Sequence, residues 1–422
     1  MHATDDGARQ PLERWLEGVR AWLAATLPPK APPADAAAGE ADFAIFRNLP
    51  EAEERALLDA IRAYRRARFD AGYGAISLPA EAGGAGLSQS HAIAFARAEA
   101  EFEVPPSSEL ISVTTGLVGP ATALFGSAEQ RPLALAFLRT DLLACQLFSE
   151  PGAGSDLAGL RCRAVRDGDE WVVDGQKVWT SGARFADYGM LLARTDPDVP
   201  KQAGITAFLL PLTTAGVEVR PIRQMSGASS FSEVFLSGVR VPDRLRLGAP
   251  GDGWRIARAT LGLERSTSGS GGRRKGGTFA DVLELARSLG RTGDPVQRQR
   301  LADLYIRTEL HAATTARVAA SLAAGEHAGS SRPASSIGKL SAAANLTLVA
   351  DVAAGLLGAR IAADTGESGT FAWTEHLLGA PGYHLAGGTD EIQRDIIGER
   401  VLGLPAEPKV DRNVPFSQLE QG

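Results

Sequence analysis

The chain has 422 residues, of which 44% are hydrophobic and 22% are charged, and its formal net charge is −6. This balance is typical of a soluble globular protein with room for one to three domains. The lack of a basic excess argues against nucleic acid as the main partner. Two cysteines, Cys145 and Cys162, are too few for a disulfide framework or a four-cysteine metal site, and we expect no metal.

From the sequence we expect neither an export signal nor a membrane-spanning segment. The N-terminal sequence MHATDDGARQPLERWLEGVR is charged and lacks the apolar core of a signal peptide. The most apolar stretch, LTLVADVAAGLLGARIAA, contains Asp351 and Arg360, and we expect it to be too polar to span a membrane. The expectation is therefore a cytoplasmic protein.

The first third of the chain is predicted to be helical, and we place an N-terminal helical domain at residues 1–144. Apolar residues recur at spacings of three and four from Leu12 to Leu27, which is the stripe of an amphipathic helix. A loop is predicted in LPPKAPPADAAAGEADF. Further helices are predicted in EAEERALLDAIRAYRRARF, SHAIAFARAEAEF and AEQRPLALAFLRTDLLA.

Short β-rich runs follow, and we place a β domain at residues 145–247. Asp174 and Gly175 lie between two such runs in EWVVDGQKVWTS, which predicts a hairpin turn at this pair. Further strands are predicted in YGMLLART, GITAFLLPL, GVEVRPI and SEVFLSGVRVP.

Helices return after Gly253, and the third domain is placed at residues 248–422. A stripe at helical spacing runs from Ile337 to Leu356, and Ile392, Ile396 and Ile397 begin another. The predicted order is therefore helices, a β domain and helices again.

The sequence EPGAGSD is the densest candidate for a binding loop. Gly152 and Gly154 would let backbone N–H groups approach a ligand, and Ser149 and Ser155 add hydroxyls. A glycine-rich loop alone is more often an ordinary turn than a binding loop. In the same way, a tryptophan on a strand, such as Trp179, is more often a core side chain than a platform for a cofactor ring.

In combination, the motifs resemble those of the acyl-CoA dehydrogenase family. The resemblance rests on EPGAGSD, VDGQKVWTSGARFADY, FSEVFLSGVRVP, GDGWRIARATLGLER and GGTDEIQRDIIGERVLGLP, which occur in the family's order between Cys145 and Pro405. It implies a mainly α fold with a central β domain: an N-terminal helical domain, a β-barrel-like middle domain and a C-terminal four-helix bundle. It also implies non-covalent FAD and a homo-oligomer, usually a tetramer.

The resemblance assigns cofactor and substrate roles by position. It implies FAD contacts for Gln146, Phe148, Ser149, Ser155, Trp179, Ser181, Thr389 and Glu391. It implies substrate contacts for Ser155, Arg265, Gly387 and Gly388. A flavin must be oriented and its ring tuned by hydrogen bonds, and serine hydroxyls, backbone N–H groups and an indole suit that task. Ser181 stands where the family commonly has threonine, and either hydroxyl can donate.

The sequence departs from the family pattern at two places. Many members carry the catalytic glutamate immediately before the last Gly-Thr, where this chain has Gly387. The Arg-x-x-Phe segment that reaches a neighbouring subunit's FAD is not recognisable, and Arg287 or Arg291 are its candidate substitutes. The basic loop from Arg273 to Lys275 could bind a phosphate of FAD or CoA, or be a solvated surface loop.

Glu264 is the candidate for the missing base. On a helix, GWRIARATLGLERS places Glu264 in the apolar half, next to Ala257 and Leu261, and a carboxylate there is costly unless it is paired or functional. Burial also raises a carboxyl pKa towards the value that suits a base near neutral pH. A glutamate paired with an arginine would fit the geometry equally well. Some family members carry the base in a Leu-x-x-Glu-Arg-like segment, and this resemblance favours Glu264.

The leading hypothesis is an FAD-dependent dehydrogenase that converts an acyl-CoA thioester to the 2,3-enoyl-CoA and passes electrons to an electron-transferring flavoprotein. The same fold could act on a carrier-protein-bound acyl group or deliver electrons to oxygen. A non-catalytic flavin-binding protein is the alternative from another class.

Overall fold

The structure is a computed structural model that describes residues 12–30, 43–46, 49–106, 108–267, 276–323, 331–362, 370–408, 411 and 413–419, with only the backbone for 263–267, 322–323, 331–334 and 370–371. The four predicted N-terminal helices are present as α1 (Leu12–Thr26), α2 (Glu51–Asp70), α3 (Gln89–Glu99) and α6 (Arg131–Arg139). The structure adds α4 (Glu109–Val113) and α5 (Gly119–Phe125), which were not predicted, with the π-helical turn η2 (Thr114–Val118) between them.

The last of these helices ends earlier than its sequence suggests. The run AEQRPLALAFLRTDLLA was predicted as helix throughout, but α6 stops at Arg139. Thr140 has a φ of 65°, the left-handed conformation that closes a helix, and its backbone N–H caps the last turn. The first strand starts at Ala144, so the final predicted helical residue belongs to the sheet.

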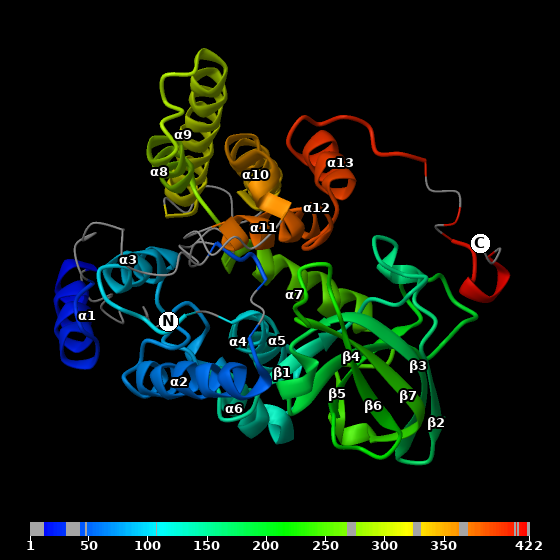
Figure 1. Cartoon of the computed structure of the whole chain (residues 1–422). Coiled ribbons are helices and arrows are strands. Elements are labelled where there is room, and N and C mark those ends of the chain that lie inside the picture. The colour runs from blue at the N-terminus through cyan, green and yellow to red at the C-terminus, as the bar shows by residue number, and fades with distance from the viewer. Residues whose placement is uncertain are drawn as a thin grey trace.

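The middle of the chain forms one eight-stranded sheet, which lies at the lower right in Figure 1. Its strands are β1 (Ala144–Leu147), β2 (Arg163–Asp167), β3 (Glu170–Ser181), β4 (Tyr188–Arg194), β5 (Ile205–Pro211), β6 (Val217–Ile222), β7 (Phe231–Pro242) and β8 (Arg246–Leu247). The order is β6-β7-β3-β2-β4-β5-β8, and β1 pairs with β4 in parallel. Every strand of the described chain lies in the predicted β region except the first residue of β1, Ala144, and the domain limits at 145 and 247 remain a prediction.

The hairpin predicted at Asp174 and Gly175 is wrong, because β3 runs through this pair without turning. The register with β7 shifts between Val173 and Gly175, which marks a β-bulge. A Cβ at Gly175 would lie 2.8 Å from the backbone of Cys162, so only glycine fits at this position. The turn between β2 and β3 lies instead at Gly168, which has a φ of 65°.

The C-terminal part is a helical bundle around α10. Its helices are α7 (Gly253–Thr267), α8 (Phe279–Ser288), α9 (Pro295–Ala323), α10 (Ser331–Leu357), α11 (Thr370–Gly379), α12 (Gly382–Leu385) and α13 (Asp390–Arg400). Helix α10 contacts α7, α8, α9, α11 and α13. Figure 1 shows α8 and α9 projecting away from the sheet.

The helical stretch Ser335–Ala362 is long and apolar enough to cross a membrane by length and composition, with a mean hydropathy of 1.6. Asp351 and Arg360 therefore do not make it too polar, contrary to the sequence-based expectation. Length and composition are weak evidence, because core helices of other proteins pass the same test. This stretch includes most of α10, which packs against other helices of the bundle, and 39% of its most apolar part is buried.

Helix α7 is the junction of the three parts. It contacts α5 and η2 of the N-terminal region, β4 and β5 of the sheet, and α10 of the bundle. Its buried face includes Ile256, Ala257 and Thr260, whereas Arg255 and Arg258 are exposed, as helical spacing predicts. A Cβ at Gly253 would lie 2.7 Å from the backbone of Ile205, so the first turn packs closely on β5.

Candidate active site

A buried ion pair fixes the loop that follows β1. The Lys177 side chain is fully buried, and its Nζ lies 2.7 Å from Oε1 of Glu150, which is 8% exposed. Lys177 Nζ also donates to the Phe148 carbonyl oxygen at 3.1 Å. The two carboxylate oxygens of Glu150 accept from the backbone N–H groups of Arg161 and Cys162 at 2.7 and 2.9 Å. The buried charges are thus paired and hydrogen-bonded, as their burial requires.

The same loop is joined to β3 beside Trp179. The Val178 N–H donates to the Ser149 carbonyl oxygen at 3.0 Å, which holds Ser149 against the strand. The pairing of β3 with β7 is irregular between Lys177 and Thr180, and Trp179 in this irregular stretch has a φ of 59°. Its indole is 60% exposed. A large apolar ring in a left-handed backbone conformation and facing solvent is typical of a ligand site rather than of a core position.

Two buried polar atoms on the neighbouring strands have no hydrogen-bond partner in the described chain. They are the Gln146 Nε2 atom on β1 and the Thr180 Oγ1 atom on β3. Both atoms are closed off from the surface, so a ligand that lies on the exposed Trp179 indole would not reach them without a rearrangement. The accessible groups are the indole and the half-buried Ser149 and Ser181, and a planar ring that accepts hydrogen bonds suits them, so the residues present fit a flavin. Sequence reasoning selected Gln146, whose amide nitrogen the structure buries.

The remaining predicted residues of this region differ in exposure. Phe148 has a buried side chain, so only its backbone is available to a ligand. Ser149 and Ser181 are half-buried, and Ser155 is exposed. A Cβ at Gly152 would meet nothing within 4 Å, so that backbone borders open space, as a phosphate-binding loop requires.

A row of aromatic rings links the sheet to the last glycine motif. Trp179 lies edge-on to Phe231, with 6.1 Å between ring centroids. Phe46 contacts Phe231 at 5.4 Å and stacks on Tyr383 at 5.7 Å. Tyr383 belongs to α12, just before the Gly387–Gly388 turn. These ring contacts connect the Trp179 motif to the Gly387–Gly388 motif, which lies about two hundred residues later in the sequence. The link runs through Phe46, which the sequence analysis did not select.

The Gly387–Gly388 turn is fixed by a buried glutamine. Both glycines have positive φ angles, 67° and 88°. Gln393 is 1% exposed and its Nε2 donates to the Gly387 carbonyl oxygen at 2.9 Å, while its Oε1 has no partner in the described chain. Thr389 caps α13 by accepting from the Ile392 N–H. These contacts hold the Gly387 carbonyl group and the start of α13 in place. Sequence reasoning missed Gln393 because it looks like one residue of a polar helix.

A polar cluster supports the other side of this turn. Asp390 accepts from Lys339 Nζ at 3.0 Å and pairs with His384 Nδ1 at 2.7 Å, and His384 Nε2 lies 2.8 Å from Thr347 Oγ1. Burial raises the pKa of Asp390, but the hydrogen bonds from His384 and Lys339 outweigh it and leave that pKa below its usual value. Glu391 is exposed and pairs with Arg394. The carboxylate of Asp390 thus ties the turn to α10.

Several predicted residues cannot be placed by their side chains. Glu264 and Arg265 lie on α7, one turn after the buried Thr260, but their side chains lie outside the described residues, as does the basic loop from Arg273 to Lys275. Arg287 lies on α8 and Arg291 follows it; both are exposed, on the part of the bundle that Figure 1 shows far from β3.

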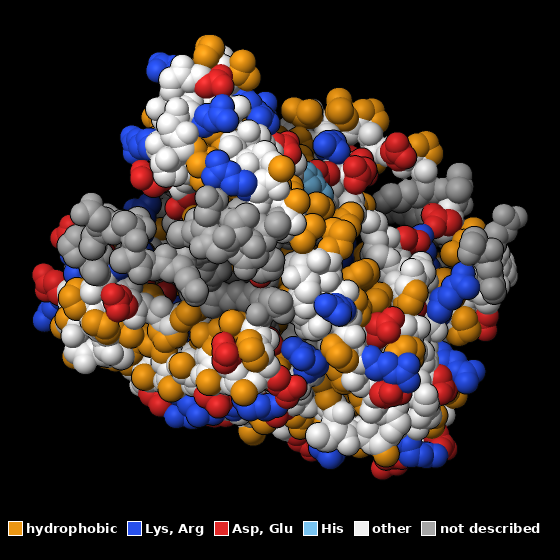
Figure 2. Space-filling model, viewed as in Figure 1, with side chains coloured by type: hydrophobic (Ala, Val, Ile, Leu, Met, Phe, Trp, Pro, Cys, Tyr) orange, Lys and Arg blue, Asp and Glu red, His pale blue; other side chains and the backbone are white. Residues whose placement is uncertain are grey.

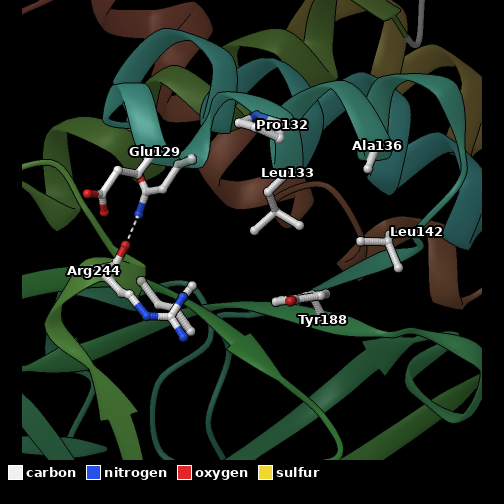
Figure 3. Close-up of a pocket in the computed structure, with 9 residues that line it drawn as sticks. Glu129, Pro132, Leu133, Ala136, Leu142, Tyr188 and Arg244 are labelled. Carbon is white, nitrogen blue, oxygen red and sulfur yellow. Dashed lines mark hydrogen bonds between the residues drawn. The ribbon is translucent and has the colours of Figure 1, made fainter.

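A pocket of about 360 Å³ lies apart from these residues (Figure 3). It is formed between α6, β4 and the 3₁₀ turns η3 (Ala128–Gln130) and η6 (Asp243–Leu245). Leu133 and Leu142 face Tyr188 across it, and Gln130 Nε2 donates to the Arg244 carbonyl oxygen at 2.8 Å. None of the residues predicted to bind cofactor or substrate lines this pocket.

Comparisons with known proteins cover nearly the whole chain. Three family models match: the acyl-CoA dehydrogenase N-terminal domain at residues 12–138, the middle domain at 145–239 and the C-terminal domain at 251–402. The acyl-CoA dehydrogenase IpdE1 of Mycobacterium tuberculosis is 37% identical over 410 residues, which are 95% of this chain and 100% of that protein.

Solved structures agree with this match. A structure titled Tcur3481-Tcur3483 steroid ACAD superposes with a TM-score of 0.72 at 27% identity, covering 94% of this chain and 99% of that chain. The ChsE4-ChsE5 complex from Mycobacterium tuberculosis superposes with a TM-score of 0.69 at 26% identity, covering the same shares.

Proposed function

The chain belongs to the acyl-CoA dehydrogenase family and is an FAD-dependent oxidoreductase, and from this premise we propose how its residues act. The observation that carries the proposal is the exposed indole of Trp179, held in a left-handed backbone conformation directly after Val178, whose N–H fixes the Ser149 loop. The ring of FAD lies against Trp179 and the Phe148–Ser149 backbone in this proposal.

The other cofactor contacts follow from the loops at either end of this face. Ser155 contacts the pyrophosphate, Ser181 and Gln146 hydrogen-bond the ring system, and Thr389 and Glu391 contact the cofactor from the start of α13. These assignments are supported by the exposure of Ser155 and Glu391 and by the cap that fixes Thr389.

Glu264 removes the α-proton of the thioester and holds it on its carboxylate. When bound, FAD accepts the hydride that leaves the β-carbon, and the loss of this proton and hydride leaves a 2,3-enoyl thioester. The Gly387 N–H donates to the thioester oxygen, where negative charge develops as the proton leaves. Gly388 gives the turn its shape, and Arg265 places the CoA side of the substrate.

The acyl group is proposed to be bulky and ring-bearing. Ala386, immediately before the Gly387–Gly388 turn, is small and exposed, so it leaves space beside the thioester. The structural relative whose title names a steroid ACAD covers 94% of this chain. Both observations favour a steroid-like or branched acyl thioester over a straight short chain.

Electron transfer and assembly complete the proposal. The electrons pass to an electron-transferring flavoprotein, and the enzyme acts in the cytoplasm. The ChsE4-ChsE5 structure is described as a complex of two chains, which supports an oligomer built from this chain and a second chain of the family, whether a copy or a different one.

Anaerobic mixing of the FAD-loaded protein with straight, branched and steroid-like acyl-CoA thioesters tests this function. We expect the flavin absorbance near 450 nm to bleach with thioesters, fastest with the steroid-like one. The same acyl groups are also offered on a carrier protein, and bleaching only with those thioesters would identify the alternative substrate. In a separate aerobic assay, oxygen uptake without an added acceptor would identify an oxidase. Bound flavin that no thioester bleaches would contradict the proposal and favour a binding protein.

A further inference from the structure

The end of the described chain folds back onto the sheet region, where Figure 1 shows it leaving α13 and reaching the side of β2 and β3. We call Asp411 and residues 413–419 the C-terminal strap. Pro415 forms an antiparallel bridge with Pro200 in the loop between β4 and β5. The Phe416 N–H donates to the Val199 carbonyl oxygen at 2.9 Å, so the strap is held by backbone contacts of its own chain.

The strap closes over a buried arginine. Arg194 is 5% exposed, and its guanidinium donates to the carbonyl oxygens of Ala158, Leu160 and Lys201 at 2.7, 3.1 and 3.0 Å. The Phe416 ring lies 3.5 Å from the guanidinium carbon, centroid to atom, which is a cation–π contact. Arg194 therefore joins three elements: the segment after the glycine loop, the β4–β5 loop and the strap.

A lysine makes the second connection. Lys201 Nζ lies 2.7 Å from Oδ2 of Asp411 in the strap and 3.0 Å from Oδ2 of Asp156. Asp156 follows Ser155 directly, so the strap reaches the end of the glycine loop through one side chain. The Lys201 side chain is 15% exposed, but Asp156 is 62% and Asp411 33% exposed, so solvent screens the Lys201–Asp156 pair more than the Lys201–Asp411 pair.

We propose that the C-terminal strap fixes the Ser155–Asp156 end of the glycine loop and thereby strengthens the binding of a pyrophosphate-bearing nucleotide. The inference rests on the proposed function, which places a pyrophosphate at Ser155. Asp411 and Phe416 act as positioning residues, since they hold Lys201 and Arg194 and those side chains hold the loop. A loop that is already ordered before binding loses less conformational entropy when the ligand binds. FAD and CoA both carry a pyrophosphate, and either can be the ligand.

The test compares the full chain with three variants: a chain that ends at Ala406, Asp411→Asn and Phe416→Leu. Gln418→Ala is the matched control, because Gln418 is an exposed residue of the same turn. Apoprotein is titrated with FAD by flavin fluorescence, and FAD-loaded protein is titrated with CoA by the change in flavin absorbance. We expect the shortened chain to raise Kd for one or both nucleotides about tenfold, which corresponds to about 1.4 kcal/mol.

The FAD and CoA titrations together show which of the two nucleotides the strap helps to bind. A higher Kd for FAD alone assigns the strap to the flavin pyrophosphate, and a higher Kd for CoA alone assigns it to the substrate. Asp411→Asn and Phe416→Leu, with far-UV circular dichroism as the check of folding, decide the question if the shortened chain does not fold. Values within twofold of the full chain in every folded variant would overturn the proposal. This failure is distinct from that of the proposed function, which the full chain shows by thioester bleaching.

Discussion

Trp179 is the side chain on which the assignment of the flavin face depends most. Its φ of 59° is unfavourable for a residue other than glycine, and its apolar indole is 60% exposed to water. The indole packs edge-on against Phe231. A non-glycine residue in this conformation costs about 1–3 kcal/mol, and such positions cluster at ligand sites. A bound planar ring that stacks on the indole accounts for both features.

Replacing Trp179 with alanine is expected to weaken FAD binding far more than folding. An exposed side chain contributes within about 0.5 kcal/mol to stability, whereas a core tryptophan contributes about 3–5 kcal/mol. The measurements are the FAD dissociation constant and the thermal midpoint of the apoprotein, with Trp179→Phe as the control that keeps a ring. A large fall in the apoprotein midpoint together with unchanged FAD affinity would show that the indole is a core residue.

Lys177→Met tests the buried ion pair at the base of the loop. Removing one partner leaves the Glu150 carboxylate buried beside an apolar side chain, which costs about 3–5 kcal/mol. Lys177→Met combined with Glu150→Gln should lose less, because no buried charge remains. Urea unfolding of the apoproteins gives both values. Equal stability of the single and double variants would mean that Lys177 does not compensate the Glu150 charge.

At the scale of elements, helices and strands with a clear period were predictable and bulges were not. The amphipathic stripe from Leu12, the continuous apolar runs of β4 and β5 and the alternating runs of β6 and β7 correspond to elements at the expected places. Asp174 and Gly175 form a favoured hairpin pair, but the same residues serve a bulge in which Asp174 accepts from the Gly238 N–H at 2.8 Å. Whether this pair forms a hairpin turn or a bulge depends on its pairing with β7, about sixty residues later, so the local sequence does not determine it.

The candidate site shows the same division. The glycine loop and Trp179 were predictable because the residues that share a role lie close together in the sequence. Phe46 and Gln393 were not, because their roles arise from contacts with Phe231 and Tyr383, and with the Gly387 carbonyl. Whether each predicted residue contacts the cofactor stays a prediction until a variant is measured.

The η6 turn gives a prediction for acid stability. Asp243 accepts from Trp171 Nε1 at 2.7 Å and from Arg246 Nε at 2.8 Å. The hydrogen bonds from Arg246 and Trp171 lower the pKa of Asp243 to about 2. Because the folded pKa is lower than the unfolded one, the stabilisation is present above the usual aspartate pKa of about 3.9 and is lost as the pH falls through 2.

Asp243→Asn should therefore be less stable than the natural chain at pH 6, and the difference should shrink between pH 4 and pH 2. Thermal unfolding of the two proteins across this range measures it. Asp169→Asn is a control on the neighbouring turn. A stability difference that stays constant down to pH 2 would contradict the assignment of the low pKa to Asp243.

At the scale of the whole molecule, α7 gives the three parts a common element. It contacts the N-terminal helices, the sheet and α10, and it carries position 264 one turn after its buried stretch. Acidic and basic side chains are interspersed over the visible face of the molecule (Figure 2), so that face offers no broad basic surface for nucleic acid. A base at position 264 on α7 would lie where the three parts meet. It would replace the catalytic glutamate that many family members carry at the position of Gly387.

The rate of flavin bleaching by Glu264→Gln tests this account most directly. The variant and the natural chain are loaded with FAD, checked for thioester binding by the shift in flavin absorbance, and mixed anaerobically with the thioester that bleaches the natural chain fastest. We expect the variant to bind FAD and thioester normally and to bleach at least ~100-fold more slowly, the low end of general-base effects. Bleaching at a near-normal rate would contradict the role of Glu264 as the base.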